Sequence, residues 1–119
     1  YDRAVKTPRD TQHALLFDQL RREAETAYGR DHRFADIRTL ADFRRQIPIQ
    51  RYDDLEPYIE RVKRGETEAL FHRQRVRMFA LTSGTTGARK FIPVTDRVLD
   101  NYRCVWTAWG VLAYAAHKS

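Results

Sequence analysis

The chain has 119 residues, 42% of them hydrophobic, and a formal net charge of +6 at pH 7. This length allows one domain at most, and the absence of a run of 18 apolar residues excludes a transmembrane helix. A single cysteine, Cys104, excludes an internal disulfide and favours a reducing cytoplasm as the location. The N-terminus is polar, without a signal-peptide core, and it lacks an initiator Met, so we expect the chain to have been cut from a longer protein.

The basic residues are 18 Arg against 4 Lys, which permits binding to nucleic acid or to another polyanion. Asp and Glu are interleaved with them, however, and no stripe of basic and aromatic residues stands out. We therefore interpret most of the arginines as a solvated, salt-bridged surface, or as a face toward protein that is missing here. A small basic nucleic-acid-binding module is kept as the alternative from another class.

Helices are expected to dominate the first 75 residues. Thr7 as N-cap, with Pro8 at the first helical position, predicts a helix from about 8 to 28 that Gly29 ends as a C-cap. Residues 31–37 follow as a loop, and His32 is interpreted as a surface residue rather than a metal ligand, because no partner at metal-ligand spacing is visible.

Two shorter helices are predicted next. Thr39 can cap one from Leu40 to Arg45. Asp53 and Glu56 resemble a capping box for another, and Gly65 stops it.

A final helix is predicted after Thr95 or Asp96, either of which can cap it. It is apolar nearly all round, which is typical of a helix covered on most sides. Because the chain contains little else to cover it, it either pairs with another copy or packs against a larger body. Cys104 lies on this helix and is interpreted as a small core hydrophobe rather than a nucleophile.

Between residues 76 and 94 the sequence predicts strand, turn and strand, with Thr82-Ser83-Gly84-Thr85-Thr86-Gly87-Ala88-Arg89-Lys90 as the turn. Glycine lets backbone N–H groups come close to a ligand, and successive N–H groups can form a concavity for an anion. The hydroxyls add donors, and Lys90 adds a mobile positive charge. These groups suit a polyphosphate.

Two other interpretations compete for this turn. One is an ordinary polar hairpin turn, since Gly and Thr are common turn residues. The other is a Walker-type loop, which needs four residues between its glycines and then Lys and Ser/Thr. Only Thr85 and Thr86 separate Gly84 and Gly87 here, and Phe-Ile-Pro follows Lys90, so a Walker loop is disfavoured.

The stretch from Phe79 to Thr95, Phe-Ala-Leu-Thr-Ser-Gly-Thr-Thr-Gly-Ala-Arg-Lys-Phe-Ile-Pro-Val-Thr, resembles the phosphate-loop motif of the adenylate-forming enzymes. Upstream, the segment from Ile47 to Gly65 resembles the Tyr-Asp-Asp and Pro-Tyr-Ile segment of one family within that superfamily, the auxin-responsive acyl-acid amido synthetases. The resemblance covers nearly the whole chain. The loop is specific to the superfamily, and the upstream segment indicates the family.

The resemblance implies an ATP-dependent ligase that activates a carboxylic acid as an acyl-adenylate and transfers it to the amine of an amino acid. ATP and Mg²⁺ are the implied cofactors, and no protein ligand for the metal is assigned. The residues implied to wrap the β- and γ-phosphates are Thr82, Ser83, Gly84, Thr85, Thr86, Gly87 and Lys90, and Lys90 is also the implied catalytic residue. An acyl-CoA ligase of the same superfamily is the near alternative.

The expected fold class is mixed α/β and helix-rich, with about four helices and a short β-hairpin that carries the loop. The expected domain is the N-terminal fragment of an ATP-binding adenylation domain: a helical lead-in (1–75), strand, phosphate loop and strand (76–95), and a buried helix (96–117). The expected partners are the substrates, the rest of the polypeptide and, for the fragment, a second copy; a membrane is not expected. The loop is one residue shorter than the plant pattern, which argues against a plant-hormone substrate, and the arginine content favours a bacterial source.

Overall fold

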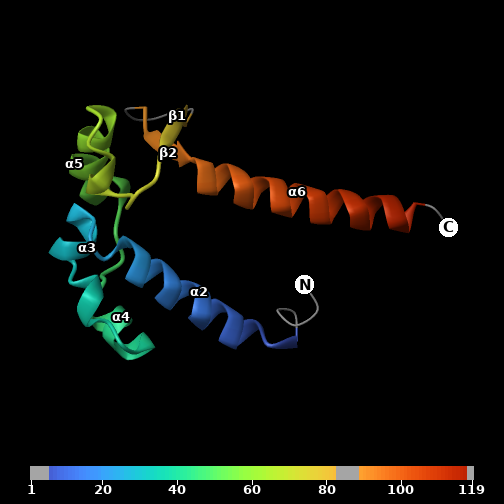
Figure 1. Cartoon of the computed structure of the whole chain (residues 1–119), viewed down its shortest axis with the longest axis horizontal. Coiled ribbons are helices and arrows are strands. Elements are labelled where there is room, and N and C mark those ends of the chain that lie inside the picture. Colours follow the sequence, from blue (N-terminus) through green and yellow to red (C-terminus); the bar gives the residue numbers. More distant parts are fainter. Residues whose placement is uncertain (1–5, 83–88, 118–119) are drawn as a thin grey trace. The chain divides into compact units, whose positions relative to one another are not determined.

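A computed structural model describes residues 6–82 and 89–117, and these divide into two compact units, 1–73 and 74–119 (Figure 1). The helices of the first unit, in chain order, are α2 (Pro8–Glu23), α3 (Ala27–Asp31), η1 (Phe34–Asp36), α4 (Leu40–Gln46), α5 (Tyr52–Lys63) and η2 (Thr67–Ala69). The second unit contains β1 (Val76–Leu81), β2 (Phe91–Thr95) and α6 (Asp96–Ala116). The predicted fold class, helix-rich with one short antiparallel hairpin, is confirmed.

The single helix predicted from 8 to 28 is wrong, because the chain turns between α2 and α3. Thr26 makes the turn: its hydroxyl donates to the carbonyl of Glu23 (2.7 Å) and accepts from the N–H of Gly29 (2.9 Å). Gly29 therefore lies inside α3 and is not a C-cap. A Cβ on Gly29 would lie 2.0 Å from the Glu23 carbonyl oxygen, so glycine is required there by the close approach of the two helices.

The predicted cap of α4 is confirmed. The N–H of Asp42 donates to the Thr39 hydroxyl (3.1 Å), and the Asp42 carboxylate accepts from the Thr39 N–H (2.9 Å). Hydrogen bonds from Thr39 and Arg45 hold the pKa of Asp42 below its usual value.

The capping box predicted for α5 is misplaced by two residues. The carboxylate of Asp54 accepts from the N–H of Arg51 at 2.7 Å, so the box spans Arg51 and Asp54 instead of Asp53 and Glu56. The extended chain before Tyr52 lets α5 begin earlier than the first Asp of the motif suggests.

The prediction that Gly65 stops α5 is confirmed. Gly65 has a φ of +97°, in the left-handed region that glycine tolerates best. Its N–H donates to the carbonyl of Val62 (3.0 Å), and the N–H of Glu66 donates to the carbonyl of Arg61 (3.0 Å). This is the Schellman pattern, which satisfies the last carbonyls of a helix.

The core of the first unit is small and aliphatic. It consists of side chains from α2, α3, α5, η2 and the residue after η1, none more than 7% exposed: Leu20, Ala27, Ile37, Ile59, Val62 and Ala69. Glu23 is buried beside this core, and its carboxylate accepts from the N–H of His72 at 2.7 Å. A buried carboxylate thus ties α2 to the end of the unit.

A polar and aromatic cluster lies around Tyr28. The Tyr28 ring stacks on His32, with centroids 4.0 Å apart, and meets Tyr58 edge-on at 5.2 Å. Gln50 accepts from the Tyr28 hydroxyl and contacts Nε2 of His32 at 2.9 Å. His32, in the turn that follows α3, is therefore half-buried and less exposed than predicted, because it lies one turn after Tyr28. The Tyr58 hydroxyl donates to Asp31, which raises the pKa of Tyr58 to about 12.

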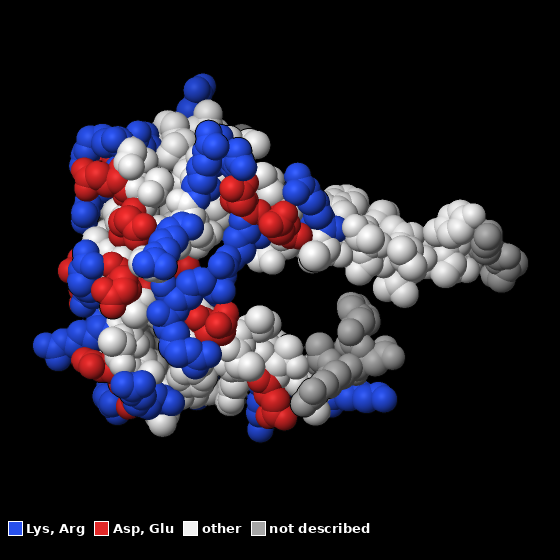
Figure 2. Space-filling model, in the orientation of Figure 1, with Lys and Arg blue, Asp and Glu red and all other residues white. Residues whose placement is uncertain are grey.

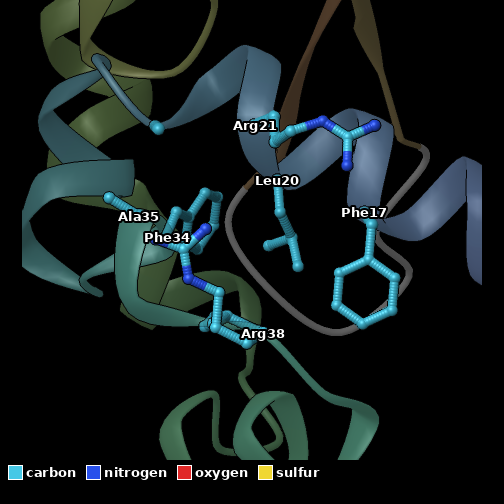
Figure 3. Close-up of a pocket in the computed structure, with 8 residues that line it drawn as sticks. Phe17, Leu20, Arg21, Phe34, Ala35 and Arg38 are labelled. Atoms are coloured by element: carbon cyan, nitrogen blue, oxygen red, sulfur yellow. The ribbon is translucent and has the colours of Figure 1, made fainter.

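Beside η1, α2 leaves a hollow of about 350 Å³ (Figure 3). Leu20 and Phe17 extend toward it from α2, and Phe34 and Arg38 line the other side. Burial of Leu20 and Ile37 beneath this hollow shows that α2 packs on the segment around η1 even though the hollow remains open to solvent.

In the second unit, α6 continues directly from β2. Thr95 is its N-cap, and the Thr95 hydroxyl accepts from the N–H of Val98 at 3.4 Å, which confirms one of the two predicted caps. None of the described helices is both long and apolar enough to cross a membrane.

Large apolar side chains are exposed along α6. Residues 104–116 contain no Lys, Arg, Asp or Glu, and Figure 2 shows this part of the helix without charge. The side chains that are 43% to 67% exposed are Val98, Tyr102, Val105, Trp106, Trp109, Val111, Leu112 and Tyr114. Cys104, predicted to be a small core hydrophobe, is also exposed, so it is not part of a core formed by the described residues. The prediction that more protein covers α6 stays a prediction.

Candidate phosphate-binding loop

The predicted loop joins two antiparallel strands. Five cross-strand pairs hold β1 to β2, from Val76 opposite Thr95 to Leu81 opposite Phe91. On one face the rings of Phe79 and Phe91 meet edge-on, with centroids 6.3 Å apart, which adds a cross-strand aromatic contact next to the loop.

Both ends of the loop are described. The N–H of Thr82 donates to the carbonyl of Lys90 at 3.2 Å, so the hairpin ladder continues one pair beyond the strands and brings these two predicted site residues together. Thr82 is partly buried, whereas Arg89 and Lys90 are exposed. The other predicted site residues lie outside the described residues: Ser83, Gly84, Thr85, Thr86 and Gly87.

At the other end of the hairpin, β1 contains a bulge. Val76 pairs with Thr95 and Met78 pairs with Val94, so Arg77 is the extra residue of β1. Nε of Arg77 lies 2.5 Å from Oδ1 of Asp96, the first residue of α6. This hydrogen bond, with further attraction from Arg77, Arg75 and Arg103, holds the pKa of Asp96 below its usual value.

Most of the chain's net positive charge lies in the unit that contains the loop. Residues 74–119 contain seven Lys or Arg and two Asp or Glu, whereas residues 1–73 contain fifteen and fourteen. Both acids of the second unit are paired with arginine, Asp96 with Arg77 and Asp100 with Arg103 at 3.1 Å. A surplus of cations with paired acids creates a positive potential, which favours an anionic ligand.

Sequence reasoning missed this asymmetry. Counted over the whole chain the acids and bases look interleaved, and only the division at residue 74 separates a nearly neutral unit from a basic one. The Arg77–Asp96 pair was also missed, because 19 residues separate its members and a bulge brings them together.

The described ends of the loop bring a threonine and cationic residues together at one end of the hairpin. Thr82 can offer a hydroxyl and Lys90 an ammonium group from neighbouring positions at the base of the turn. Among the described residues no group of three or more His, Cys, Asp or Glu is placed to hold a metal ion.

Comparison with known proteins gives one family, described as the GH3 family N-terminal domain, which matches residues 1–118. Plant proteins are similar to the chain. The 4-substituted benzoates-glutamate ligase GH3.12 of Arabidopsis thaliana is 35% identical over 65 residues, which is 54% of this chain and 11% of the relative. The indole-3-acetic acid-amido synthetase GH3.8 of Oryza sativa subsp. indica is 32% identical over 97 residues, 81% of this chain and 16% of the relative.

A third relative extends the match. The indole-3-acetic acid-amido synthetase GH3.2 of Arabidopsis thaliana is 25% identical over 104 residues, 87% of this chain and 19% of the relative. The chain therefore spans between about a tenth and a fifth of the length of these curated relatives.

Proposed function

The chain belongs to the GH3 family, and from this premise we propose that it is the N-terminal part of an ATP-dependent acyl-acid amido synthetase. Its relatives include proteins named as a benzoate–glutamate ligase and as indole-3-acetic acid-amido synthetases. Because the matched relatives are much longer than the chain, the activity is proposed for the whole protein. In this proposal the chain is the beginning of the adenylation domain, with a helical lead-in, a phosphate hairpin and a helix that the rest of the domain covers.

The main observation behind the proposal is the hairpin, together with the net positive charge of the unit that contains it. The bond between Thr82 and Lys90 closes the base of the loop, and the unit around it holds the surplus of positive charge. ATP fits this environment because its triphosphate is the most highly charged anion in the proposed reaction. We therefore assign the grip on the β- and γ-phosphates to the loop residues, which are Thr82, Ser83, Gly84, Thr85, Thr86, Gly87 and Lys90.

The proposed reaction has two steps. A carboxylate oxygen of the acid attacks the α-phosphorus of ATP, and the bond to the β-phosphate oxygen breaks, which gives an acyl-adenylate and pyrophosphate. The amine of an amino acid then attacks the acyl carbon, AMP leaves with the electron pair of the broken bond, and the nitrogen loses a proton. Donors around the β- and γ-oxygens stabilise the charge of the departing pyrophosphate, and we assign part of this role to Lys90 at the end of the loop.

Mg²⁺ is proposed as the second cofactor, and it neutralises part of the phosphate charge when bound. The two described carboxylates of this unit, Asp96 and Asp100, are each paired with an arginine, so we assign neither of them as a metal ligand. In the proposal, oxygens of the nucleotide and of other parts of the protein would therefore coordinate the metal.

Pyrophosphate exchange tests the proposal. The whole protein encoded by the gene is incubated with ATP, labelled pyrophosphate and a panel of aromatic and aliphatic carboxylic acids. Acid-dependent exchange into ATP is expected. Folded protein that exchanges with none of the acids would contradict the proposal.

The acceptor is tested separately, with ATP, the best acid and either mixed amino acids or coenzyme A. The names of the relatives favour the amino acids, so an amide is the expected product. A thioester in its place would move the protein to the acyl-CoA ligases of the superfamily. The isolated 119-residue chain is expected to show no turnover, because it cannot enclose the transition state by itself.

Lys90→Ala tests the role of the loop cation. We expect exchange to fall by about 10²-fold, the usual cost of one lost charge-stabilising donor, with little change in unfolding free energy because Lys90 is exposed. Lys63→Ala is the matched control, since Lys63 pairs with Glu60 on α5 in the other unit. Equal rate losses in the two variants would remove Lys90 from the mechanism.

A further inference from the structure

We propose that Arg77 and Asp96 form a brace that positions the phosphate loop, with Arg77 as a positioning residue for nucleotide binding; this inference rests on the proposed function. The pair joins β1 to the first residue of α6, at the end of the hairpin opposite the loop. Its members touch no reacting atom in the proposal. They act through the register of the two strands.

The bulge in β1 creates the pair. In a regular antiparallel ladder Arg77 would lie opposite a residue of β2, but here Val76 and Met78 take the successive partners Thr95 and Val94. Bulges commonly redirect a side chain and increase the local twist of the strands. The Arg77 guanidinium is thereby directed to Asp96, and the contact of 2.5 Å is short for a charged hydrogen bond.

The pair also fixes the junction between β2 and α6. Thr95 precedes Asp96, is 1% exposed and caps the helix through its hydroxyl. A carboxylate at the first turn of a helix is stabilised by the helix dipole, so Asp96 serves the helix and the brace at once. Any movement of β1 against β2 would have to break a contact anchored at this buried cap.

A brace matters because the hairpin has only two described strands. Isolated two-stranded hairpins are marginally stable in water, so one charged cross-link at the open end can change how often the other end opens. Arg77 and Asp96 are 44% and 49% exposed, so the pair contributes no more than an ordinary surface ion pair. The expected effect is therefore a modest change in how often the hydrogen bond between Thr82 and Lys90 opens.

Amide hydrogen exchange at Thr82 in the whole protein measures how often the base of the loop opens, because the N–H of Thr82 bonds to the carbonyl of Lys90 there. Arg77→Ala and Asp96→Asn are each expected to speed exchange at Thr82 by about 2- to 5-fold. The double variant should add little to either single change, because both remove the same contact. Arg77→Lys, which keeps the charge, should recover part of the protection.

Arg103→Ala is the matched control. Arg103 makes a similar exposed pair with Asp100, at 3.1 Å, but both members lie on α6 and do not join the hairpin to the helix. Exchange at Thr82 should change much less in this variant than in Arg77→Ala, because Arg103 attracts Asp96 without bonding to it. Unchanged exchange in Arg77→Ala, or equal acceleration in Arg103→Ala, would overturn the brace.

The functional consequence is measured in the whole protein by the pyrophosphate-exchange assay. Arg77→Ala should raise the KM for MgATP by about 2- to 5-fold and leave kcat nearly constant, because the pair touches no reacting atom. If wild-type protein shows no exchange, the proposed function fails while the Thr82 measurement still judges the brace. If exchange occurs and KM does not change, the positioning role fails alone.

Discussion

The two units of the chain differ in how far they bury their apolar side chains and balance their charged ones. The first unit buries six aliphatic side chains and nearly balances fifteen bases with fourteen acids. In the described part of the second unit, Thr95 is the buried residue, and eight large apolar side chains of α6 are exposed. The first unit buries an aliphatic core of its own, whereas the described part of the second unit leaves most of its large apolar side chains exposed.

The two units also differ in what stabilises them and in which features of the proposed function they contain. Core packing, caps and a buried carboxylate hold the first unit together, whereas the loop, the basic surplus and the apolar helix gather in the second. The described part of residues 74–119 therefore exposes basic and apolar side chains, which in our proposal a nucleotide and a larger protein body cover. Matched substitutions in the two units can separate these two kinds of region.

The largest difference is expected between Leu20→Ala and Leu112→Ala. Leu20 is 4% exposed and Leu112 is 58% exposed. Truncation of the buried leucine should lower the unfolding free energy by about 2–5 kcal/mol, whereas the exposed one should cost less than about 0.5 kcal/mol. Urea unfolding of the 119-residue chain, followed by far-ultraviolet circular dichroism, measures both. Equal costs would mean that α6 is covered in solution, for example by a second copy.

The same substitution at two glycines should have opposite signs. Gly29→Ala places a Cβ 2.0 Å from the Glu23 carbonyl, so it should destabilise the first unit by about 1–3 kcal/mol. Gly110→Ala meets no atom within 4 Å on α6, so it should stabilise that helix by about 0.5–1 kcal/mol. Thermal unfolding of the two variants compares them. A destabilising Gly110→Ala would indicate a partner packed closely on α6.

Thr26 should show how much the turn between α2 and α3 depends on one hydroxyl. Thr26→Val keeps the shape but leaves the Gly29 N–H and the Glu23 carbonyl without this partner in a fully buried site, at a cost of about 1–3 kcal/mol. Thr26→Ser keeps the hydroxyl and should cost much less. The comparison by urea unfolding would contradict the hydrogen-bond account if the two variants were equally destabilised.

The smallest effect is expected in alkali, from the pair of Tyr58 and Asp31. Because folding raises the pKa of Tyr58 from its usual value near 10 to about 12, its contribution to stability is fully present below pH 10 and is lost as the pH rises through 12. Tyr58→Phe should abolish this part of the pH dependence. Tyrosinate absorbance of wild type and Tyr58→Phe identifies the titration, and Asp31→Asn should lower its midpoint.

Local signals in the sequence predicted several elements correctly. The caps at Thr39 and Thr95, the stop at Gly65 and the hairpin depend on neighbours within a few residues, and the structure confirms them. The errors arose where a more distant contact decides. Gly29 looks like a C-cap until α3 packs against the end of α2, and His32 looks exposed until Tyr28 and Gln50 surround it.

The candidate site divides in the same way. The loop was predicted from its glycines, hydroxyls and lysine between two β-type runs, and phosphate binding there stays a prediction because residues 83–88 lie outside the described residues. The charge around it could not be assigned until the chain was divided at residue 74. Arg77 and Asp96 could not be paired from the sequence, because a bulge has no unique residue signature.

By itself, the sequence determined the helix-rich class, the hairpin and the resemblance that led to the family, because these depend on local patterns and on residue identity. The tertiary structure decided the break at Thr26, the reason for a glycine at position 29 and the contact between β1 and α6. Each of these depends on atoms that approach across a turn or between strands. Residue spacing along the chain does not determine such distances, whereas packing and hydrogen bonding do.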